Sequence, residues 1–250
     1  MAFYSQVADD RFESTEHTRG PWDANSQHAG PPAALLGRAV ERIARPDMRL
    51  ARLTFDISRP VPIAPLNVTT RVIREGRSVA VVEAAAEPYL RCTALLIRQS
   101  VEAVPEVAGP GLRLEDAEPK PFFPVPWEVG YHTSMEVRFA AGSFLEPGPA
   151  TCWMRMKVPL VDGEAPSPLQ RVLAAADSGN GVSNVLDFSQ HVFINADLTV
   201  HLIRYPAGEW VCLDATTSID PDGIGLADTA LFDERGRIGR AAQSLFVAPR

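Results

Sequence analysis

Three polar side chains in the second half of the chain have mostly apolar neighbours, which makes them candidates for chemistry. Asp177 ends a run that begins at Ser167, in which leucine, valine and alanine recur at helical spacing and little of the circumference is charged. Gln243 lies in a strand-like run, and counting in twos places it on one face with Ala241, Leu245 and Val247. A carboxylate or carboxamide at the edge of a core is costly unless it is paired or takes part in a reaction.

The third side chain is Asn195, in the strand-like run 191–203. Alternation puts it on one face with Asp197, Thr199 and His201, an unusually polar face for a strand beside a core helix. Together the three residue types suit the activation of a water molecule. Burial and the negative end of the helix would raise the pKa of Asp177 toward neutrality, and amide donors from Asn195 and Gln243 would keep enough of the anion to abstract a proton.

Each of these residues also has a structural interpretation. Asp177 would be a turn residue ahead of Gly179, which would cap the end of the helix. Gln243 would be a buried amide bonded to the backbone, and Asn195 would be exposed to solvent. The residues alone leave both interpretations open.

The elements that carry these residues follow an order that occurs twice. In the first half, a proline-led helix over 29–43 precedes strand-like runs at 50–58, 67–74, 78–86 and 90–98. In the second half, runs at 131–139 and 151–158 precede the helix that begins at Pro168, and runs at 191–203, 209–218, 225–232 and 237–247 follow it. We therefore predict an α+β fold of two modules, each an antiparallel sheet wrapped around one long apolar helix. Residues 1–103 form the first module, the Pro-rich stretch 104–126 is the linker, and 127–250 form the second module.

Composition limits the partners and the compartment. The chain has 250 residues, of which 46% are hydrophobic, and a formal net charge of −7, so a nucleic acid would be repelled. Cys92, Cys152 and Cys212 lie inside apolar runs and are expected to be buried and reduced. The chain has no uncharged run long enough to span a membrane and no signal sequence, so we expect a soluble cytoplasmic protein. The histidines lack metal-ligand spacing and no phosphate-binding glycine loop occurs, so no metal or cofactor is implied.

The plan of the chain resembles the acyl-CoA thioesterase II family, whose members have a double-hotdog fold. The resemblance spans nearly the whole chain and is clearest in four segments that fall in the family's order: 176–179 (Ala-Asp-Ser-Gly), 195–199 (Asn-Ala-Asp-Leu-Thr), 209–210 (Glu-Trp) and 242–244 (Ala-Gln-Ser). It implies two tandem hotdog modules and a water-activating site made by Asp177, Asn195 and Gln243. The family's well-studied members carry threonine where this chain has Asn195.

The resemblance implies hydrolysis of an acyl-CoA to a free acid and CoA. A thioester is an activated acyl group, so a base and an oriented water suffice without a covalent nucleophile. We expect the substrate to contact His28, Gly30 through its backbone N–H, Gly179, and Arg237 through the CoA phosphates. His28 has the alternative of capping a turn, and Arg237 that of a solvated turn beside Arg235 and Arg240.

Aligning the halves on their helices puts Glu41, Thr54 and Ala94 near the places of Asp177, Asn195 and Gln243, so only the second half carries the full set. We therefore expect one site per chain. Two other functions are kept as alternatives: a hotdog dehydratase or hydratase acting on acyl thioesters, for which His201 is the histidine available in the second module, and a non-catalytic acyl-CoA binding protein. Because a hotdog sheet leaves edges and a face to cover, we also expect a homodimer or a higher homo-oligomer.

Overall fold

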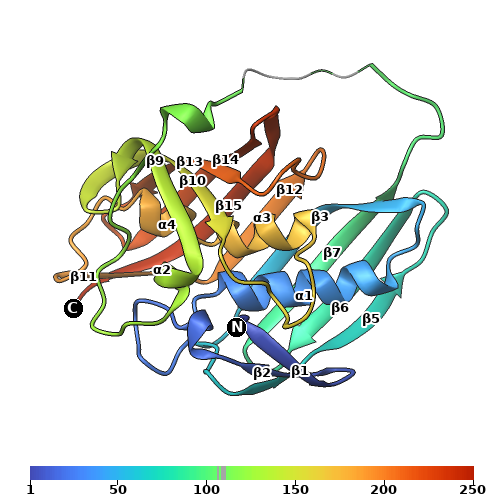
Figure 1. The fold of residues 1–250 in the computed structure, drawn as a ribbon, viewed down its shortest axis with the longest axis horizontal. Helices are drawn as coiled ribbons and strands as arrows, with labels where there is room; N and C mark the ends of the chain where they lie inside the picture. The colour runs from blue at the N-terminus through green and yellow to red at the C-terminus, as the bar shows by residue number, and fades with distance from the viewer. Residues whose placement is uncertain (106, 108–110) are drawn as a thin grey trace.

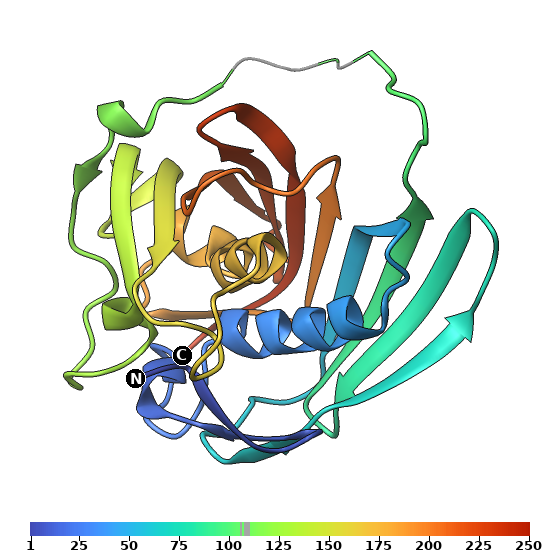
Figure 2. The ribbon, with the colours of Figure 1, turned by 45° about the vertical axis from the view of Figure 1, so that its right-hand side comes forward.

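A computed structural model describes residues 1–105, 107 and 111–250 of the chain. Helices α1 (Gly30–Ile43) and α3 (Pro168–Ala176) lie on the inner side of one large curved sheet (Figures 1 and 2), and two short helices, α2 (Tyr131–Ser134) and α4 (Gly179–Val182), accompany them. The strands are β1 (Tyr4–Ala8), β2 (Arg11–Ser14), β3 (Met48–Ile57), β4 (Pro65–Asn67), β5 (Thr69–Arg74), β6 (Val79–Ala86), β7 (Leu90–Arg98), β8 (Glu118–Pro119), β9 (Met135–Ser143), β10 (Glu146–Met156), β11 (His191–Asn195), β12 (Asp197–Leu202), β13 (Val211–Ile219), β14 (Ile224–Asp233) and β15 (Gly236–Pro249). The 3-10 helices are η1 (Glu16–Thr18) and η2 (Leu114–Asp116).

The large sheet has twelve strands and runs through both halves of the chain. Its order is β5, β6, β7, β3, β12, β15, β14, β13, β10, β9, β8, with β11 also paired to β15. The halves meet where β3 pairs antiparallel with β12, so that Asp56 lies opposite Asp197 and Thr54 opposite Thr199. A smaller sheet, β1–β2–β4, lies apart from it.

Helix α1 begins and ends where the sequence predicts. Pro31 and Pro32 lie in its first turn, where a missing N–H costs nothing, and the chain leaves the helix at Ala44, before Pro46. Ten of its fourteen residues are buried. The helix contacts β6, β7 and β3 on one side and α3 on another, so it has an apolar surface over most of its circumference.

Helix α3 starts as predicted but ends in a different way. The Ser167 side chain accepts from Gln170 N, as an N-cap should, and Pro168 opens the helix. Asp177 is the C-cap residue, but Gly179 does not cap the helix in a left-handed conformation; it is the first residue of α4. The predicted Gly179 cap is therefore wrong, and the chain continues through Asp177 and Ser178, both in the right-handed helical region, into a second short helix.

The predicted strand over 191–203 is in fact two strands, and the break reverses a face. In β11 Asn195 pairs with Leu245, whereas in β12 Thr199 pairs with Ala242, so the register against β15 shifts by one residue at Ala196. Asn195 consequently faces inward, and the outward residues of β12 are Asp197, Thr199 and His201. The predicted shared face of Asn195 with these three residues is wrong.

Two further differences concern the region before α3. The predicted strand 131–139 starts as α2, because Gly130 and Thr133 bond to each other in a capping arrangement, and the strand begins at Met135. Residues 106 and 108–110 of the predicted linker lie outside the described residues. Leu112, Leu114 and Ala117 pack against Trp153, Trp210 and Cys212.

The cysteines are free and buried, as expected. None of the helices in the described part of the chain has the length and apolar character needed to cross a bilayer.

Candidate active site

Asp177 lies between the ends of the two main helices. It is the C-cap of α3, and the backbone N–H groups of Ala29 and Gly30, at the start of α1, are directed at its carboxylate. Only 7% of the residue is exposed. The carboxylate therefore meets the negative end of one helix and the positive end of another, and the second interaction stabilises its anion.

Both predicted carboxamides bond to this carboxylate. Asn195 Nδ2 donates to Asp177 Oδ1 over 2.9 Å, and Gln243 Nε2 donates to the same oxygen over 3.2 Å. Gln243 is 1% exposed; it also donates to the Asp177 backbone carbonyl and accepts from Asn180 N over 2.9 Å. The structure thus brings Asp177, Asn195 and Gln243 together from α3, β11 and β15.

His28 approaches the other carboxylate oxygen. Its Nδ1 lies 3.1 Å from Asp177 Oδ2 and also 3.1 Å from Gly30 N. A neutral ring with its proton on Nε2 has one lone pair on Nδ1, which accepts either from Gly30 N–H or from a protonated Asp177. The ring stacks on Tyr131, with centroids 3.7 Å apart and planes at 3°. His28 therefore caps the start of α1 through Gly30 N–H, as its alternative interpretation predicts, and also contacts Asp177.

The tyrosine connects His28 to the end of α3. Tyr131 Oη donates to Ala174 O over 2.7 Å and lies 2.9 Å from Ser178 Oγ, which must then be the donor in that second bond because the phenol has a single hydrogen. Tyr131 is fully buried. It fixes the plane of the imidazole and the start of the turn that carries Asp177.

The electrostatics of the site follow from burial. Desolvation raises the pKa of Asp177 from 3.8 to about 7, against the opposing effect of hydrogen bonds from Asn195, the Ala29 and Gly30 backbone and Gln243. Desolvation lowers the pKa of His28 to about 3, so the imidazole is neutral at physiological pH. Near neutrality Asp177 is divided between its acid and its base, which is the condition that suits a general base.

Glycines allow the close contacts around Asp177. A Cβ on Gly30 would lie 2.4 Å from Ala174 O, so only glycine lets the start of α1 approach the end of α3 this closely. A Cβ on Gly179 would lie 2.5 Å from Thr229 Oγ1 and 3.1 Å from Gln243 Oε1. Both glycines thus lie behind the site, where their backbone is packed against neighbouring elements.

A cavity of about 410 Å³ opens beside Asp177. His28, Asp177 and Asn195 line it, together with Asn180 and a set of aromatic rings. Gly30, Gly179 and Gln243 are not among its lining residues. Arg237 lies elsewhere: its side chain is in a shallow surface hollow with Asp214, Asp228 and Arg240, so the structure does not place it beside this cavity.

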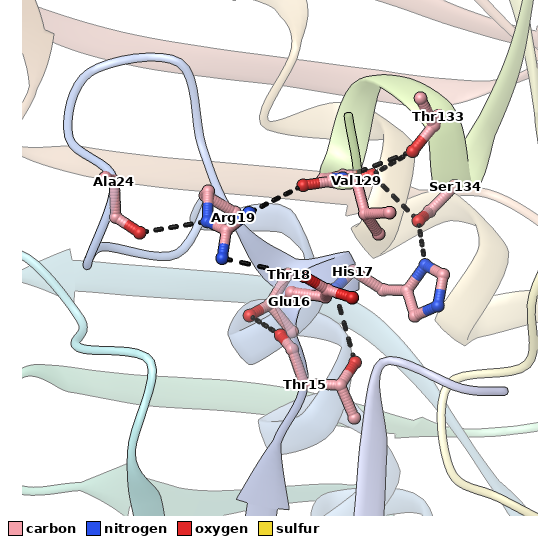
Figure 3. A network of polar contacts seen from close by, with 10 residues as sticks. Thr15, Glu16, His17, Thr18, Arg19, Ala24, Val129, Thr133 and Ser134 are labelled. Carbon is pink, nitrogen blue, oxygen red and sulfur yellow. Dashed lines mark hydrogen bonds and ion pairs between the residues drawn. The ribbon is translucent and has the colours of Figure 1, made fainter. Parts of the chain in front are cut away.

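Arg19 connects the loop before α1 to the loop before α2 (Figure 3). Its side chain donates to Ala24 O and to Val129 O, each over 2.9 Å, and its backbone carbonyl accepts from Tyr131 N. Next to it, His17 Nδ1 lies 2.8 Å from Ser134 Oγ. These bonds tie the loop before α1, which carries His28, to helix α2, which begins with Tyr131.

Three site residues were missed by sequence reasoning or assigned a minor part. Tyr131 and Asn180 come from elements far apart in the sequence, and His28 had only its place before a helix to point to it. The signal that could have found His28 is its position directly before Ala29 and Gly30, whose N–H groups begin α1. Asn180 Oδ1 is buried and has no hydrogen-bond partner within the described part of the chain. Across residues 1–105, 107 and 111–250 no group of three or more His, Cys, Asp or Glu side chains is arranged to hold a metal ion.

Two family models match the two halves of the chain. The model described as the acyl-CoA thioesterase N-terminal domain matches residues 18–97, and the model described as the acyl-CoA thioesterase C-terminal domain matches residues 114–247. A search of the curated proteins finds no relative.

Several solved structures have the same fold at low sequence identity. A protein assigned as a thioesterase II, from Thermobifida fusca YX, is 20% identical with a TM-score of 0.77, and the match covers 98% of this chain and 95% of that one. The acyl-CoA thioesterase II TesB2 from Mycobacterium marinum is 15% identical, with a TM-score of 0.67 and coverage of 99% and 95%. A protein with a hot dog fold from Alicyclobacillus acidocaldarius is 16% identical, with a TM-score of 0.70 and coverage of 99% and 95%. These matches identify the fold of this chain as a hot dog fold.

Proposed function

The chain belongs to the acyl-CoA thioesterase family and is a thioester hydrolase, and from this premise we propose that Asp177 is the general base of the reaction. Asn195 and Gln243 hold the carboxylate in position for an attacking water. The observation that carries the proposal is a single carboxylate oxygen, Asp177 Oδ1, that accepts from both carboxamides beside a cavity.

The proposed reaction transfers one proton to Asp177 and back. The ionised carboxylate takes a proton from water as the water oxygen bonds to the thioester carbon. The tetrahedral intermediate then collapses, the carbon–sulfur bond breaks, and the proton held by Asp177 passes to the departing CoA thiolate. While Asp177 is protonated, its Oδ2 is within hydrogen-bond reach of His28 Nδ1, 3.1 Å away.

The oxyanion of that intermediate needs hydrogen-bond donors. Gly30 N–H, predicted for this role, donates to His28 Nδ1 in the structure. Gly30 also does not line the cavity, so its N–H would reach a substrate oxygen only after a local rearrangement of the start of α1.

Thiol release from a panel of acyl-CoA substrates tests the proposal. We expect Asp177→Asn to lower kcat by about 10²- to 10⁴-fold, the usual contribution of a general base, because the amide cannot take the proton. The variant should stay folded, since an amide oxygen still accepts from Asn195 and its NH₂ can donate to His28. An Asp177→Asn enzyme as fast as wild type would show that another group activates the water.

One observation favours a second reaction, dehydration or hydration of an acyl thioester. That chemistry uses a histidine beside a carboxylate, and the structure provides His28 beside Asp177, whereas His201 is exposed on β12. The family match favours hydrolysis. Mass analysis of the product separates the two reactions, because hydrolysis yields a free acid and dehydration an enoyl thioester.

We also propose how the chain is divided into modules and how it assembles. The two halves are tandem hotdog modules, 1–103 and 127–250, joined by 104–126, since α1 packs on β6 and β7 and α3 packs on β10 and β13. A homodimer is supported by β5, an edge strand whose six residues are all exposed. Light scattering that gives the mass of one chain would refute the dimer without affecting the reaction.

A further inference from the structure

The wall of the cavity beside Asp177 is mainly aromatic. Five of the eleven phenylalanines of the chain line it, along with a tryptophan: Trp22, Phe122, Phe123, Phe144, Phe188 and Phe246. The larger aliphatic side chains that line it are Ile57, Val61 and Ile194. Aromatic residues make up only 8% of the chain, so this many rings in one cavity wall indicates that they serve the ligand that the cavity binds.

Most of the rings come from loops, although Phe123 and Phe144 also belong to the main hydrophobic core and Phe246 lies on β15. Phe122 and Phe123 follow β8, Phe144 lies between β9 and β10, Phe188 lies between α4 and β11, and Trp22 precedes α1. The residue types of a strand are constrained by the alternation between core and surface. The residue types of a loop are less constrained in this way and can be selected for contact with a ligand. Four separate segments converge on this one cavity with an aromatic ring.

The rings also fix one another's orientation. Phe144 stacks on Phe188 with centroids 5.3 Å apart and planes at 12°, and Phe122 meets Phe144 edge-on at 5.3 Å and 75°. Further in, Phe123 lies parallel to Tyr131, which stacks on His28. The chain of rings thus runs from the cavity wall to the histidine that contacts Asp177. Rings held in this way present fixed faces and edges, to which a flat aromatic guest is complementary.

The size of the cavity favours a compact guest. Its volume of about 410 Å³ lies in the lower part of the range of ligand pockets, roughly 300–1,000 Å³. The thioester and the end of its pantetheine arm must enter the same space in order to reach Asp177. A single ring beside them needs less space than a palmitoyl chain, and a rigid ring loses less conformational freedom on binding than an alkyl chain does.

On the basis of the proposed function, we propose that the acyl group hydrolysed at this site is an aryl or arylalkyl group, such as benzoyl or phenylacetyl, and not a long unbranched alkyl group. Each additional ring–ring contact favours an aromatic guest over an alkyl one by a factor of about 2 to 12. With several rings in the wall, a preference of at least about tenfold is expected.

Binding tests the proposal independently of turnover. Titration calorimetry would compare two non-hydrolysable thioethers of equal carbon count, S-phenacyl-CoA and S-(2-oxooctyl)-CoA. We expect S-phenacyl-CoA to bind at least about tenfold more tightly, and kcat/KM for phenylacetyl-CoA to exceed that for octanoyl-CoA by a similar factor. Equal or tighter binding of the alkyl thioether would overturn the inference.

Substitutions locate the preference on the rings. Phe188→Leu, at a half-buried loop position, and Phe144→Leu each keep an apolar side chain but remove a ring, and each should reduce the aryl-to-alkyl binding ratio by about 2- to 12-fold. Phe232→Leu is the matched control, since Phe232 packs with the Trp153 and Trp210 cluster away from the cavity, and it should leave the ratio unchanged. A ratio that survives both ring substitutions would also refute the inference.

The outcomes separate this inference from the proposed function. If octanoyl-CoA is hydrolysed as well as phenylacetyl-CoA and the two thioethers bind equally, the aryl preference is wrong and the hydrolase proposal stands. If no thioester is hydrolysed but S-phenacyl-CoA still binds preferentially, the mechanism at Asp177 fails and the aryl preference stands.

Discussion

The charge state of Asp177 results from two opposed effects at one residue. Burial disfavours the anion, while two carboxamides and the backbone N–H groups at the start of α1 favour it. The effect of burial is the larger, and the pKa of Asp177 is about 7. Without those donors the carboxylate would be protonated throughout the neutral range and could not act as a base. With full solvent exposure it would be too weak a base to abstract a proton from water efficiently.

The pH profile of the enzyme should follow this residue. The base form of Asp177 grows with pH, so kcat/KM is expected to rise up to a pH of about 7 and then level off. Asn195→Leu removes a donor that lowers the pKa, so the inflection should move to higher pH; Asn195→Thr retains a hydroxyl donor and should move it less. A profile that is flat across neutral pH would contradict the assignment of Asp177 as the base.

The same pKa predicts how stability depends on pH. An unfolded Asp177 titrates near 3.8 and the folded one near 7, so the folded state holds the proton more tightly. Its stabilising contribution is present below about pH 4 and is lost as the pH rises to about 7, by up to roughly 4 kcal/mol at 1.36 kcal/mol per pKa unit.

Asp177→Asn removes this pH-dependent loss. The free energy of unfolding of each protein is measured by urea titration at about pH 5 and about pH 8.5. The variant minus wild-type difference in this free energy should be a few kcal/mol larger at the higher pH. A difference between the two proteins that is the same at both pH values would show that the carboxyl titrates alike in the folded and unfolded states.

At the scale of elements, the site depends on how closely α1 approaches α3. Gly30 and Gly37 both face α3, and a Cβ on either would collide with it: on Gly30 with the backbone oxygen of Ala174 at 2.4 Å, and on Gly37 with the terminal Leu173 Cδ1 at 2.3 Å. A backbone oxygen cannot move without moving the helix, whereas the tip of a leucine can change rotamer.

Gly30→Ala and Gly37→Ala form a matched pair on the same helix. We expect Gly30→Ala to lower stability by roughly 1–3 kcal/mol and to reduce kcat/KM, because the N–H groups directed at Asp177 shift with the helix. Gly37→Ala gains up to about 1 kcal/mol of helix propensity, which offsets part of its clash, and should change kcat/KM little. Thermal unfolding and thiol-release assays check both; equal losses of activity would exclude a specific role for the start of α1.

How much of this could be read from the sequence depends on the range of the interactions involved. The two helix starts are set by local chemistry, proline in the first turn and Ser167 as a cap, and both were predictable. The inward orientation of Gln243 followed from alternation in an unbroken strand. The inward orientation of Asn195 did not, since it depends on a register shift at Ala196 that only the pairing with β15 imposes. The contact of His28 with Asp177 depends on the packing of α1 against α3, for which the sequence has no local signal.

At the scale of the whole molecule, the two halves share an approximate two-fold arrangement but only one site. Asp177 lies at the end of α3, next to the start of α1. In the other half Glu41 lies near the end of α1, next to the start of α3, and accepts a hydrogen bond from Ser167 Oγ over 2.7 Å. Burial raises the pKa of Glu41 as it does that of Asp177. However, the donors to Glu41 are the side chains of Ser167 and Gln170, from α3 and its cap, and the position aligned with Gln243 on the sheet is Ala94, whose side chain has no amide.

The site itself is built across the two halves. The first half supplies His28 and the N–H groups of Ala29 and Gly30, while the second supplies Asp177, Asn195 and Gln243. The halves are held together by the β3–β12 pairing, by the packing of α1 on α3, and by the bond of buried Arg38 to Glu164 at 2.7 Å. These contacts do not depend on an unbroken connection through 104–126, so a cut near its start should leave the site in place.

A cut in the connecting segment tests this arrangement. A protease recognition sequence inserted after Val104, which is 73% exposed, should be cleaved without loss of the fold. The two fragments are expected to elute together on gel filtration and to keep kcat/KM within about twofold, because the sheet, the helix pair and the Arg38–Glu164 bond still join them. After separation in denaturant, neither fragment alone should hydrolyse a thioester, since each lacks part of the Asp177 environment, and mixing them during refolding should restore activity. Activity of the C-terminal fragment, 105–250, by itself would show that His28 and the start of α1 are not needed.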